Sequence, residues 1–429
     1  MRAQRPGTRH QGQDMPASTT DDIGYDPFDV TVMGNPYPYY QKLRAQQPVY
    51  YTPQYDTYWL SRYADIEDML QPRNNSKLVS SESSIPMPEV LRQHHAGKPP
   101  QASLDPMAPM TLLHSPHYDE VRRAHAQPFT PRAVAQLEDF ARRTTRELLA
   151  PCLARGEFDL FLDYGGMLSA LLTCRLFDID PALAPEILET VNATTAYDPE
   201  RGGIDNAQLF LRMQRFMLPS VARRRAAGAD GSAPLFDGLI NYRTNPDGRA
   251  LRDEEICDQL TCAFVANTET PGKVAAQGLL ELSRRPQQLA EVRADLATNV
   301  PVAAEEMLRY CAPAQWFLRT VHEDVEIAGV TMRAGQRVAG LINSANRDER
   351  EYENSEEFIW NRPIRKQLAF GMGQHHCLGL HIARLQIRVL VEEFLARVES
   401  YEFDLDRAVL RPSYFHCAYT SLPVRVTAR

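Results

Sequence analysis

The stretch that decides the fold is AFGMGQHHCLGLHIAR, residues 369–384, near the C-terminal end of the 429-residue chain. Its key positions follow the spacing F-G-x-G-x-H-x-C-x-G and are Phe370, Gly371, Gly373, His375, Cys377 and Gly379. The two central glycines allow the backbone to pass close to another group, because glycine has no side chain. Cys377 stands directly before a predicted helix, 378–399. A helix N-terminus favours an anion, so we expect it to lower the thiol pKa and stabilise a thiolate.

Three interpretations of Cys377 are open, two from the residues alone and the third implied by the family resemblance described next. A lone cysteine is most often a buried structural residue. His375, His376 and His381 stand close by and favour zinc, although zinc sites usually gather ligands from two separated pairs and the sequence has no second pair. The third interpretation is a thiolate ligand of a haem, where the sulfur pushes electron density onto iron.

The segment resembles the haem-ligand loop of the cytochrome P-450 family, with six positions matched in order. Two more segments are similar to the same family. AAEEMLRY, 303–310, contains its E-x-x-R pair, and AFVANTETPGK, 263–273, falls on its pattern A-G-x-[DE]-T. The resemblance extends from about Tyr25 to the C-terminus. With three motifs matched, haem is favoured over zinc.

This resemblance implies a mainly α fold with a minor β part, arranged as a single triangular haem domain over 23–429. Residues 1–22 are polar, have no apolar signal-like core and are predicted to be a disordered tail. The cofactor implied is haem b, iron protoporphyrin IX, with Cys377 as the iron ligand. Residues implied to lie against the haem are Phe370, Gly371 and Ala266. Residues implied to form a structural network are Glu306, Arg309 and Arg362.

For the reaction, the resemblance implies a monooxygenase that activates O2 with two electrons and inserts one oxygen atom into a small organic substrate. Glu269 and Thr270 match the acid and alcohol that relay protons to the iron-bound oxygen. Asn267 replaces the usual glycine, and we expect it to crowd the pocket or bind a ligand. Pro271 lacks an N–H, so it should break the helix locally and expose the carbonyl of Asn267.

The haem carboxylates need hydrogen-bond donors, and four residues match the family positions that supply them. Arg122, Arg319 and His375 bring positive charge or ring N–H groups. Tyr118 stands where the family usually has a histidine. A phenol can still donate one hydrogen bond but carries no charge.

Family position also suggests residues of the substrate pocket, although each of them is more often plain core. They are Asn267, Val265, Trp316, Phe317, Tyr197 and Phe415. The sequence Thr270-Pro271-Gly272 is similar to actinobacterial members that oxidise or nitrate aromatic amino acids. We therefore expect natural-product biosynthesis or catabolism, with a substrate that is aromatic or amino-acid-derived.

Composition limits the partners and the compartment. With 47 basic and 55 acidic residues the net charge is -8, which argues against nucleic acid as a partner. No run of about 18 apolar residues predicts a membrane span. Seven scattered cysteines fit a reducing cytoplasm. Electrons must come from elsewhere, and the resemblance implies a ferredoxin and its reductase. A basic patch for the ferredoxin is predicted from Arg122, Arg123, Arg384 and Arg388.

Hydrophobic periodicity gives the expected elements. A β-hairpin is predicted over 48–61 and two strands over 325–342. Helices are predicted at the end of 24–45 and over 63–70, 131–150, 157–180, 182–197, 206–227, 233–242, 252–284, 286–295, 298–310 and 378–399.

Two functional alternatives remain at this point. Within the family, the chain could oxidise its substrate without inserting oxygen, by aryl coupling or nitration, because Asn267 and Pro271 depart from the usual motif. Outside it, the chain could be a non-catalytic haem-binding protein.

Overall fold

The computed structural model describes residues 23–82, 86–103, 108–197, 206–243 and 248–429. The predicted N-terminal tail, 1–22, lies outside the described residues. Helices make up most of the described chain, as the periodicity predicts. Their bounds are α1 Val30–Gly34, α2 Tyr37–Gln46, α3 Tyr63–Met69, α4 Pro88–Leu91, α5 His117–His125, α6 Pro131–Ala135, α7 Glu138–Arg155, α8 Gly166–Leu176, α9 Ala184–Thr194, α10 Asn206–Ala226, α11 Pro234–Asn241, α12 Asp253–Ser283, α13 Pro286–Ala294, α14 Leu296–Cys311, α15 Ile342–Ala345 and α16 Leu380–Arg397.

The strands form small sheets. The largest has the order β1-β2-β8-β5-β3, and the three-stranded sheet has the order β4-β12-β9. Pairs β6-β7 and β10-β11 complete the set. The bounds are β1 Val49–Thr52, β2 Thr57–Leu60, β3 Leu78–Val79, β4 Glu157–Asp159, β5 Trp316–Val321, β6 Val325–Ile327, β7 Val330–Met332, β8 Arg337–Leu341, β9 Val398–Phe403, β10 Val409–Leu410, β11 Tyr419–Ser421 and β12 Pro423–Ala428.

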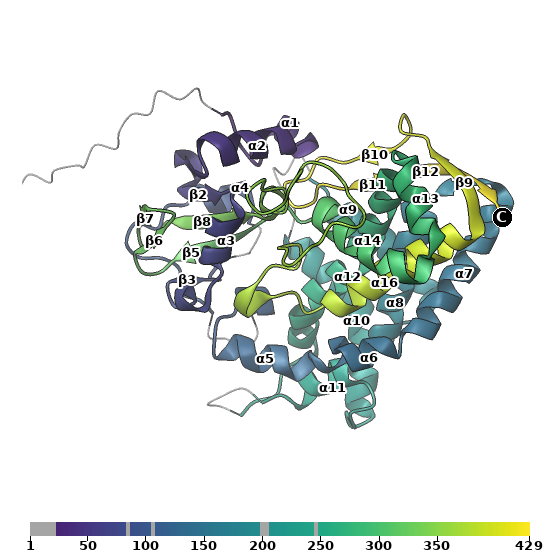
Figure 1. The fold of residues 1–429 in the computed structure, drawn as a ribbon. Coiled ribbons are helices and arrows are strands. Elements are labelled where there is room, and N and C mark those ends of the chain that lie inside the picture. Colours follow the sequence, from purple (N-terminus) through teal and green to yellow (C-terminus); the bar gives the residue numbers. More distant parts are fainter. Residues whose placement is uncertain (1–22, 83–85, 104–107, 198–205, 244–247) are drawn as a thin grey trace, which may run out of the picture.

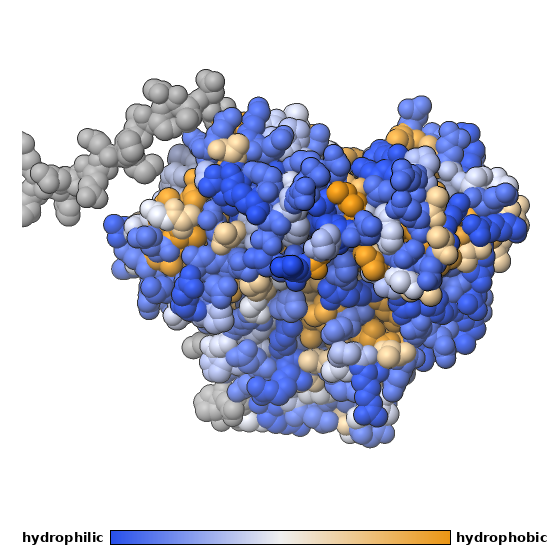
Figure 2. Space-filling view, viewed as in Figure 1, coloured by the Kyte–Doolittle hydropathy of each residue, from blue (hydrophilic) through white to orange (hydrophobic). Residues whose placement is uncertain are grey.

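Figure 1 shows the five-stranded sheet with α1 to α4 on one side of the molecule and the large helices on the other. The predicted mainly α fold with a minor β part is therefore confirmed. In the space-filling view the same face is mostly hydrophilic, with hydrophobic residues showing near its middle (Figure 2). None of the helices in the described ranges is long and apolar enough to span a membrane.

The long helix α12 lies at the centre of the helical part. It packs against α8, α10, α14 and α16, and most of its side chains are buried. Its approach to α8 depends on glycine. A side chain on Gly272 would place its Cβ 2.5 Å from the carbonyl carbon of Gly165, the residue before α8. Two backbones therefore touch at this crossing, which fixes how deeply α12 sits in the fold.

Three local predictions need correction. Residues 157–159 were expected to be helical but form β4, because they pair with β12 at the far end of the chain. The helix expected over 131–150 divides into α6 and α7. The segment 325–342 was expected to hold two strands and holds three. Strands β6 and β7 pair with each other, and β8 pairs with β2 and β5 in the large sheet.

Candidate functional site

The cysteine loop, 369–379, crosses from the end of a long irregular segment to the start of α16. Gly371 has φ +63° and Gly373 φ +68°, a conformation that side chains other than glycine rarely adopt. A Cβ on Gly373 would also lie 2.4 Å from the carbonyl oxygen of Leu70. The backbone N–H of Cys377 donates to the carbonyl of Phe370 at 2.9 Å and closes the loop. Both glycines are thus required by the path of the chain.

The expected lowering of the Cys377 pKa does not occur in the protein alone. Burial raises the pKa of this thiol, although the N–H of Gly379 and the cations Arg122 and Arg384 oppose the effect. Helix α16 begins at Leu380, three residues beyond the cysteine, so its N-terminus acts more weakly than predicted. A thiolate at this position needs a further positive charge, such as a coordinated metal ion, which deprotonates a thiol outright.

One face of α12 looks toward the cysteine loop. Along this face Cys262 and Ala266 are exposed and Thr270 is half-buried, each four residues from the last, in a helix that is otherwise mostly buried. Surrounding protein and, second, the Cys377 thiol raise the pKa of Cys262 to about 11. The Cys262 side chain is surrounded by protein at a distance but is exposed at its own surface. It therefore lines the space between α12 and the cysteine loop. The sequence analysis missed Cys262, although its spacing from Ala266 and Thr270 marks it.

Donors gather beside this space. The guanidinium of Arg122 donates to the hydroxyl of Tyr118 at 2.7 Å and to the carbonyl of His376 at 2.6 Å. The rings of Tyr118 and His375 lie 4.2 Å apart between centroids. The hydroxyl of Tyr118 accepts from Arg122, so its own proton remains available to an acceptor.

Arg319 is the last member of this group and gives the clearest indication of which ligand the group could bind. Its side chain is 9% exposed, and it donates to the carbonyl of its neighbour Leu318 at 2.7 Å. Within the described part of the chain it has no carboxylate partner, and burial lowers its pKa to about 10. A buried, unpaired guanidinium is costly unless an anion joins it. The group of Arg122, Tyr118, His375 and Arg319 therefore suits a ligand with carboxylates.

The alcohol and the acid predicted for proton transfer, Thr270 and Glu269, lie in different surroundings. Thr270 is half-buried on the face that looks toward the cysteine loop. Glu269 is fully buried and paired: Lys273 donates to its Oε2, Thr195 donates to the same oxygen at 3.1 Å, and His416 lies 3.2 Å from its Oε1. Burial would raise the Glu269 pKa, but Lys273 and then His416 lower it. Glu269 is therefore a carboxylate held in an ion pair.

Two expectations about the neighbours of Glu269 are corrected. The amide of Asn267 donates to Thr173 at 2.8 Å and accepts from Gln386 at 3.0 Å, so it faces α8 and α16 and does not crowd the pocket. Helix α12 is continuous through Pro271 from Asp253 to Ser283, so the helix does not open there as expected, although Pro271 cannot donate to the carbonyl of Asn267. Packing on several sides holds the helix together there.

The remaining pocket candidates differ in how deeply they are buried. Trp316 is 1% exposed and packs edge-on against Trp59 at 5.2 Å, so its predicted place in the pocket is corrected to the aromatic core. Val265 is also buried. Phe317, Tyr197 and Phe415 are half-buried. In strand β5, Phe317 alternates with Trp316 and shares its face with Arg319.

The sequence of the described structure was compared with known proteins. A family described as "Cytochrome P450", here written P-450, matches residues 212–412. Cytochrome P-450 130 of Mycobacterium tuberculosis (strain ATCC 25618 / H37Rv) is 30% identical over 408 residues, which are 92% of this chain and 96% of the relative. The chain belongs to the cytochrome P-450 family.

Solved structures agree. A mutant of P-450 EryK in complex with erythromycin B has a TM-score of 0.78 at 25% identity and covers 92% of this chain and 97% of its own. HmtN, a post-tailoring hydroxylase involved in himastatin biosynthesis, has a TM-score of 0.74 at 25% identity, with 89% and 94% covered. The chain is thus an enzyme of the monooxygenase class of oxidoreductases, and the resemblance seen in the sequence is confirmed.

Cytochromes P-450 carry a haem iron, and the residues of this site fit one. The half-buried thiol of Cys377 can supply a soft ligand once a cation is present. Arg319 offers a buried charge with no acidic partner among the described residues, which a haem carboxylate would match. The three neighbouring histidines do not gather with Cys377 into a metal-binding group within the described ranges. This disfavours the zinc interpretation.

The E-x-x-R pair lies away from this site, in a buried network. Arg309 donates to both carboxylate oxygens of Glu306, at 2.7 and 2.8 Å, and Arg362 lies 3.2 Å from the same carboxylate. Arg309 also donates to the carbonyls of Asn346 and Ser355. The structure therefore brings the three predicted network residues together, between α14 and the irregular segment that leads to the cysteine loop.

Proposed function

We propose that this cytochrome P-450 binds haem b through the thiolate of Cys377 and inserts one atom of O2 into a small organic substrate. The observation that carries the proposal is the glycine-dependent loop that sets the half-buried Cys377 opposite the open face of α12. The haem supplies the oxygen activation. The chain supplies the ligand, the orientation and the protons.

Each group of residues has a role that follows from its place. Arg122, Arg319, His375 and Tyr118 hold the haem carboxylates through charge and N–H or O–H donors. Phe370 and Gly371 border the cysteine side of the haem, and Ala266 borders the α12 side, where a larger side chain would obstruct the ring. A haem held by these residues would lie next to the α12 face that carries Thr270.

Proton delivery falls to Thr270 and Glu269. Thr270 borders the haem pocket and can pass a proton by exchanging hydrogen bonds. Glu269 holds negative charge next to it, because Lys273 lowers its pKa. A carboxylate beside an alcohol can accept a proton and hand it on, which is general acid–base catalysis.

The substrate is a small molecule, aromatic or amino-acid-derived, that fits a pocket bordered by Phe317, Tyr197 and Phe415. Half-buried aromatic side chains are typical of such pockets. Two relatives at 25% identity support natural-product biosynthesis: one was solved with erythromycin B and the other is a post-tailoring hydroxylase. Catabolism of a similar compound is the alternative within this proposal.

The electrons come from a ferredoxin and its reductase in the cytoplasm. All seven cysteines lie in the described part of the chain and are free, which suits a reducing compartment. Oxidation without oxygen insertion is the less favoured alternative: Pro271 and the similarity of Thr270-Pro271-Gly272 to members that nitrate aromatic amino acids support it, but Asn267 does not. The side chain of Asn267 faces α8 and α16, and the helix is continuous at Pro271.

The test is the absorption spectrum of the dithionite-reduced protein under carbon monoxide. We expect the strongly red-shifted Soret band of thiolate-bound haem, and its loss in Cys377→Ser. Cys262→Ser is the matched control, since it removes a thiol from the opposite side of the same space and should keep the band. A histidine-type band that survives Cys377→Ser, or no haem in folded, haem-supplied protein, would refute the proposal.

A further inference from the structure

A buried ionic cluster lies on α12 next to the face that looks toward the cysteine loop. Glu269 is fully buried, Lys273 is 2% exposed and His416 is 6% exposed. The Lys273 ammonium contacts Oε2 of Glu269 and also lies 5.5 Å from the ring centroid of Phe161. A lysine buried this deeply is rare unless it is paired. Its pairing with the acid of the proton-transfer motif therefore calls for a functional explanation.

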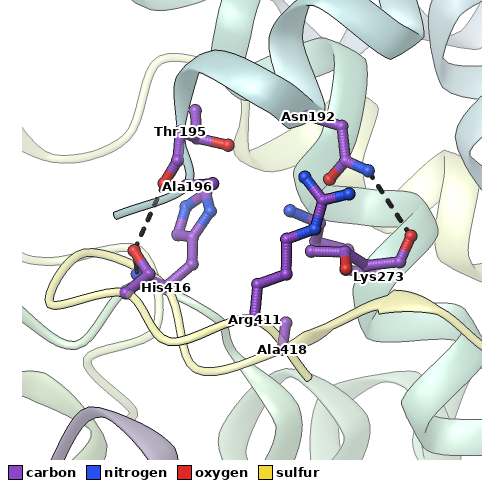
Figure 3. Close-up of a pocket in the computed structure, with 9 residues that line it drawn as sticks. Asn192, Thr195, Ala196, Lys273, Arg411, His416 and Ala418 are labelled. Atoms are coloured by element: carbon purple, nitrogen blue, oxygen red, sulfur yellow. Dashed lines mark hydrogen bonds between the residues drawn. The ribbon is translucent and has the colours of Figure 1, made fainter. Parts of the chain in front are cut away.

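A pocket opens directly above this cluster (Figure 3). It is small, with a cavity volume of about 10 Å³, which is roughly the space of one water, and is lined by Asn192, Thr195, Ala196, Lys273, Arg411, Ser413, His416, Ala418 and Thr420. Figure 3 shows the Arg411 side chain between those of His416 and Lys273, and Arg411 is exposed. The pocket thus connects the solvent side of the C-terminal segment with the buried ion pair.

The lining of this pocket suits water. The amide oxygen of Asn192 is buried there without a hydrogen-bond partner in the described chain. The ring atom Nδ1 of His416 also lacks one, since its approach to Glu269 does not have hydrogen-bond geometry. Hydroxyls of Thr195 and Ser413 lie on the same wall. A buried water needs two to four polar partners, and these groups provide them.

We propose that Lys273 and His416 are positioning residues that keep Glu269 ionised and connect it, through water in this pocket, to protons from the solvent. The proposal rests on the function proposed above, because Glu269 and Thr270 deliver protons in it. It adds the route by which Glu269 receives a new proton and the two residues that control this route.

The proton balance of this route is simple. Nε2 of His416 accepts a proton from the pocket water, and the ring becomes an imidazolium. Nδ1 lies 3.2 Å from Oε1 of Glu269, and a small turn of the ring brings its Nδ1–H into line with this oxygen, so that Nδ1 releases its proton to Glu269. The neutral carboxyl then gives its proton to the side of Thr270 and returns to a carboxylate paired with Lys273. The pocket water is reprotonated from the solvent. No electrons move, and no other reactant is consumed.

The charges around Glu269 favour this cycle. The titratable groups that face it are Lys273 on its own helix and His416 on the C-terminal segment, with Arg411 farther out in the pocket. Helix α9 and the turn after it contribute Asn192 and Thr195, which do not titrate. Burial lowers the pKa of His416, which favours the neutral ring, and the charge of Glu269 opposes this and so favours its protonation.

The first test measures the charge of Glu269 in the holoenzyme without turnover. Infrared spectra at neutral pH should show no protonated-carboxyl band from Glu269 in the wild type. In Lys273→Met the unpaired carboxylate should take up a proton, so a new band should appear and should vanish in the Lys273→Met, Glu269→Gln double variant. Lys273→Arg should keep the wild-type spectrum. A Glu269 band in the wild type, or no new band in Lys273→Met, would overturn the proposal.

The second test measures proton supply. Oxygen consumption driven by a surrogate plant ferredoxin and its reductase should fall about tenfold in Lys273→Met and in His416→Gln, with a larger solvent deuterium isotope effect. Lys273→Arg should retain most of the rate. Lys366→Met, an exposed lysine paired with Glu67 and Glu351, is the control and should match the wild type. Wild-type rates and isotope effects in both test variants would overturn the proposal.

The two proposals fail in different ways. If the carbon monoxide spectrum shows thiolate-bound haem while these variants behave as wild type, the enzyme function stands and the proton route falls. If Lys273→Met does not fold, the double variant with Glu269→Gln removes both buried charges together. It should then fold and show the slow oxygen consumption expected of a broken route, and a wild-type rate in it would contradict the proposal.

Discussion

At the scale of single residues, Arg319 should affect the haem-free protein and the haem-bound protein in opposite ways. Its guanidinium is buried with no carboxylate partner among the described residues. We expect Arg319→Met to leave the haem-free protein equally or more stable, because an unpaired buried charge is removed. Haem affinity should fall about ten- to hundredfold, from a charge-assisted hydrogen bond of about 1.5–3 kcal/mol. Thermal unfolding and haem transfer to apomyoglobin measure the two effects.

Arg337 provides the matched control for this prediction. It is fully buried like Arg319 but is paired with Glu82 at 2.7 Å. Arg337→Met leaves a carboxylate without its partner, so it should destabilise the haem-free protein by about 3–5 kcal/mol. Equal destabilisation by both variants would show that Arg319 is already satisfied within the protein.

His125 makes the stability depend on pH. Its Nδ1–H donates to the carbonyl of Val121 at 2.7 Å, and burial lowers its pKa from 6.5 to about 4. The unfolded chain takes up a proton near pH 6.5, whereas the folded chain does so only near pH 4. The contribution is therefore complete above pH 6.5 and is lost as the pH falls through this window, by about 3 kcal/mol.

His125→Gln should remove this part of the pH dependence, because glutamine keeps a donor for the carbonyl and does not titrate. Denaturant unfolding of both proteins between pH 7 and pH 4 measures the free energies. The wild type should lose about 3 kcal/mol of unfolding free energy relative to the variant as the pH falls from about 6.5 to about 4. Parallel curves would mean that His125 is protonated equally in both states.

The residue scale also shows what the sequence could predict. Gly371 and Gly373 followed from spacing, since the backbone has a positive φ at both, whereas the role of Cys377 stays a prediction. The direction of Asn267 did not follow, because successive residues of a helix point about 100° apart and the motif alone does not say which neighbour lies there. Trp316 failed for the same reason in a strand, where alternate residues face opposite sides.

At the scale of elements, the crossing of α12 and α8 depends on a glycine contact. A Cβ on Gly272 would lie 2.6 Å from the carbonyl oxygen of Gly165, and backbone cannot move as a flexible side chain can. We expect Gly272→Ala to lower the free energy of unfolding by about 2–3 kcal/mol. Gly34→Ala is the control, because nothing lies within 4 Å of its added Cβ, and it should change stability by less than about 0.5 kcal/mol.

Calorimetry of the two alanine variants decides this prediction. Equal stability of both would mean that α12 can shift away from α8 without loss. A shift of that kind would also move Thr270 and Ala266 relative to the cysteine loop, and the Soret band of the haem protein would report it.

Element boundaries show where periodicity stops being informative. Helix α12 was expected over 252–284 and runs from Asp253 to Ser283, because its long buried pattern leaves little choice. Strand β4 was missed since its three residues gain their pairing from β12, more than 260 residues later. Short strands of this kind are set by a distant partner and not by their own sequence.

At the scale of the whole molecule, the local charge beside the cysteine loop differs from the net charge of the chain. The chain carries a net charge of -8, yet a ferredoxin is itself acidic and needs a cationic surface. Four arginines were predicted to provide it. Arg384 is bound by Glu305 at 2.6 Å and Arg388 by Glu138 at 2.7 Å, so both are largely neutralised. The patch is therefore smaller than the sequence suggested and is centred on α5.

Arg123 on α5 should dominate ferredoxin docking. It is exposed and has no ion-pair partner in the ranges the structure describes, while its neighbour Arg122 is tied to the carbonyl of His376 in the cysteine loop. Arg123→Glu should slow association with an acidic ferredoxin about three- to tenfold at low salt, because long-range attraction sets the encounter rate. Stopped-flow reduction across a salt series measures this, and the difference should disappear at high ionic strength, where charges are screened.

Arg425→Glu, on β12 at the other end of the molecule (Figure 1), changes the net charge equally and should leave the rate nearly unchanged. Equal slowing by both variants would show that net charge, and not a surface beside the cysteine loop, governs the encounter.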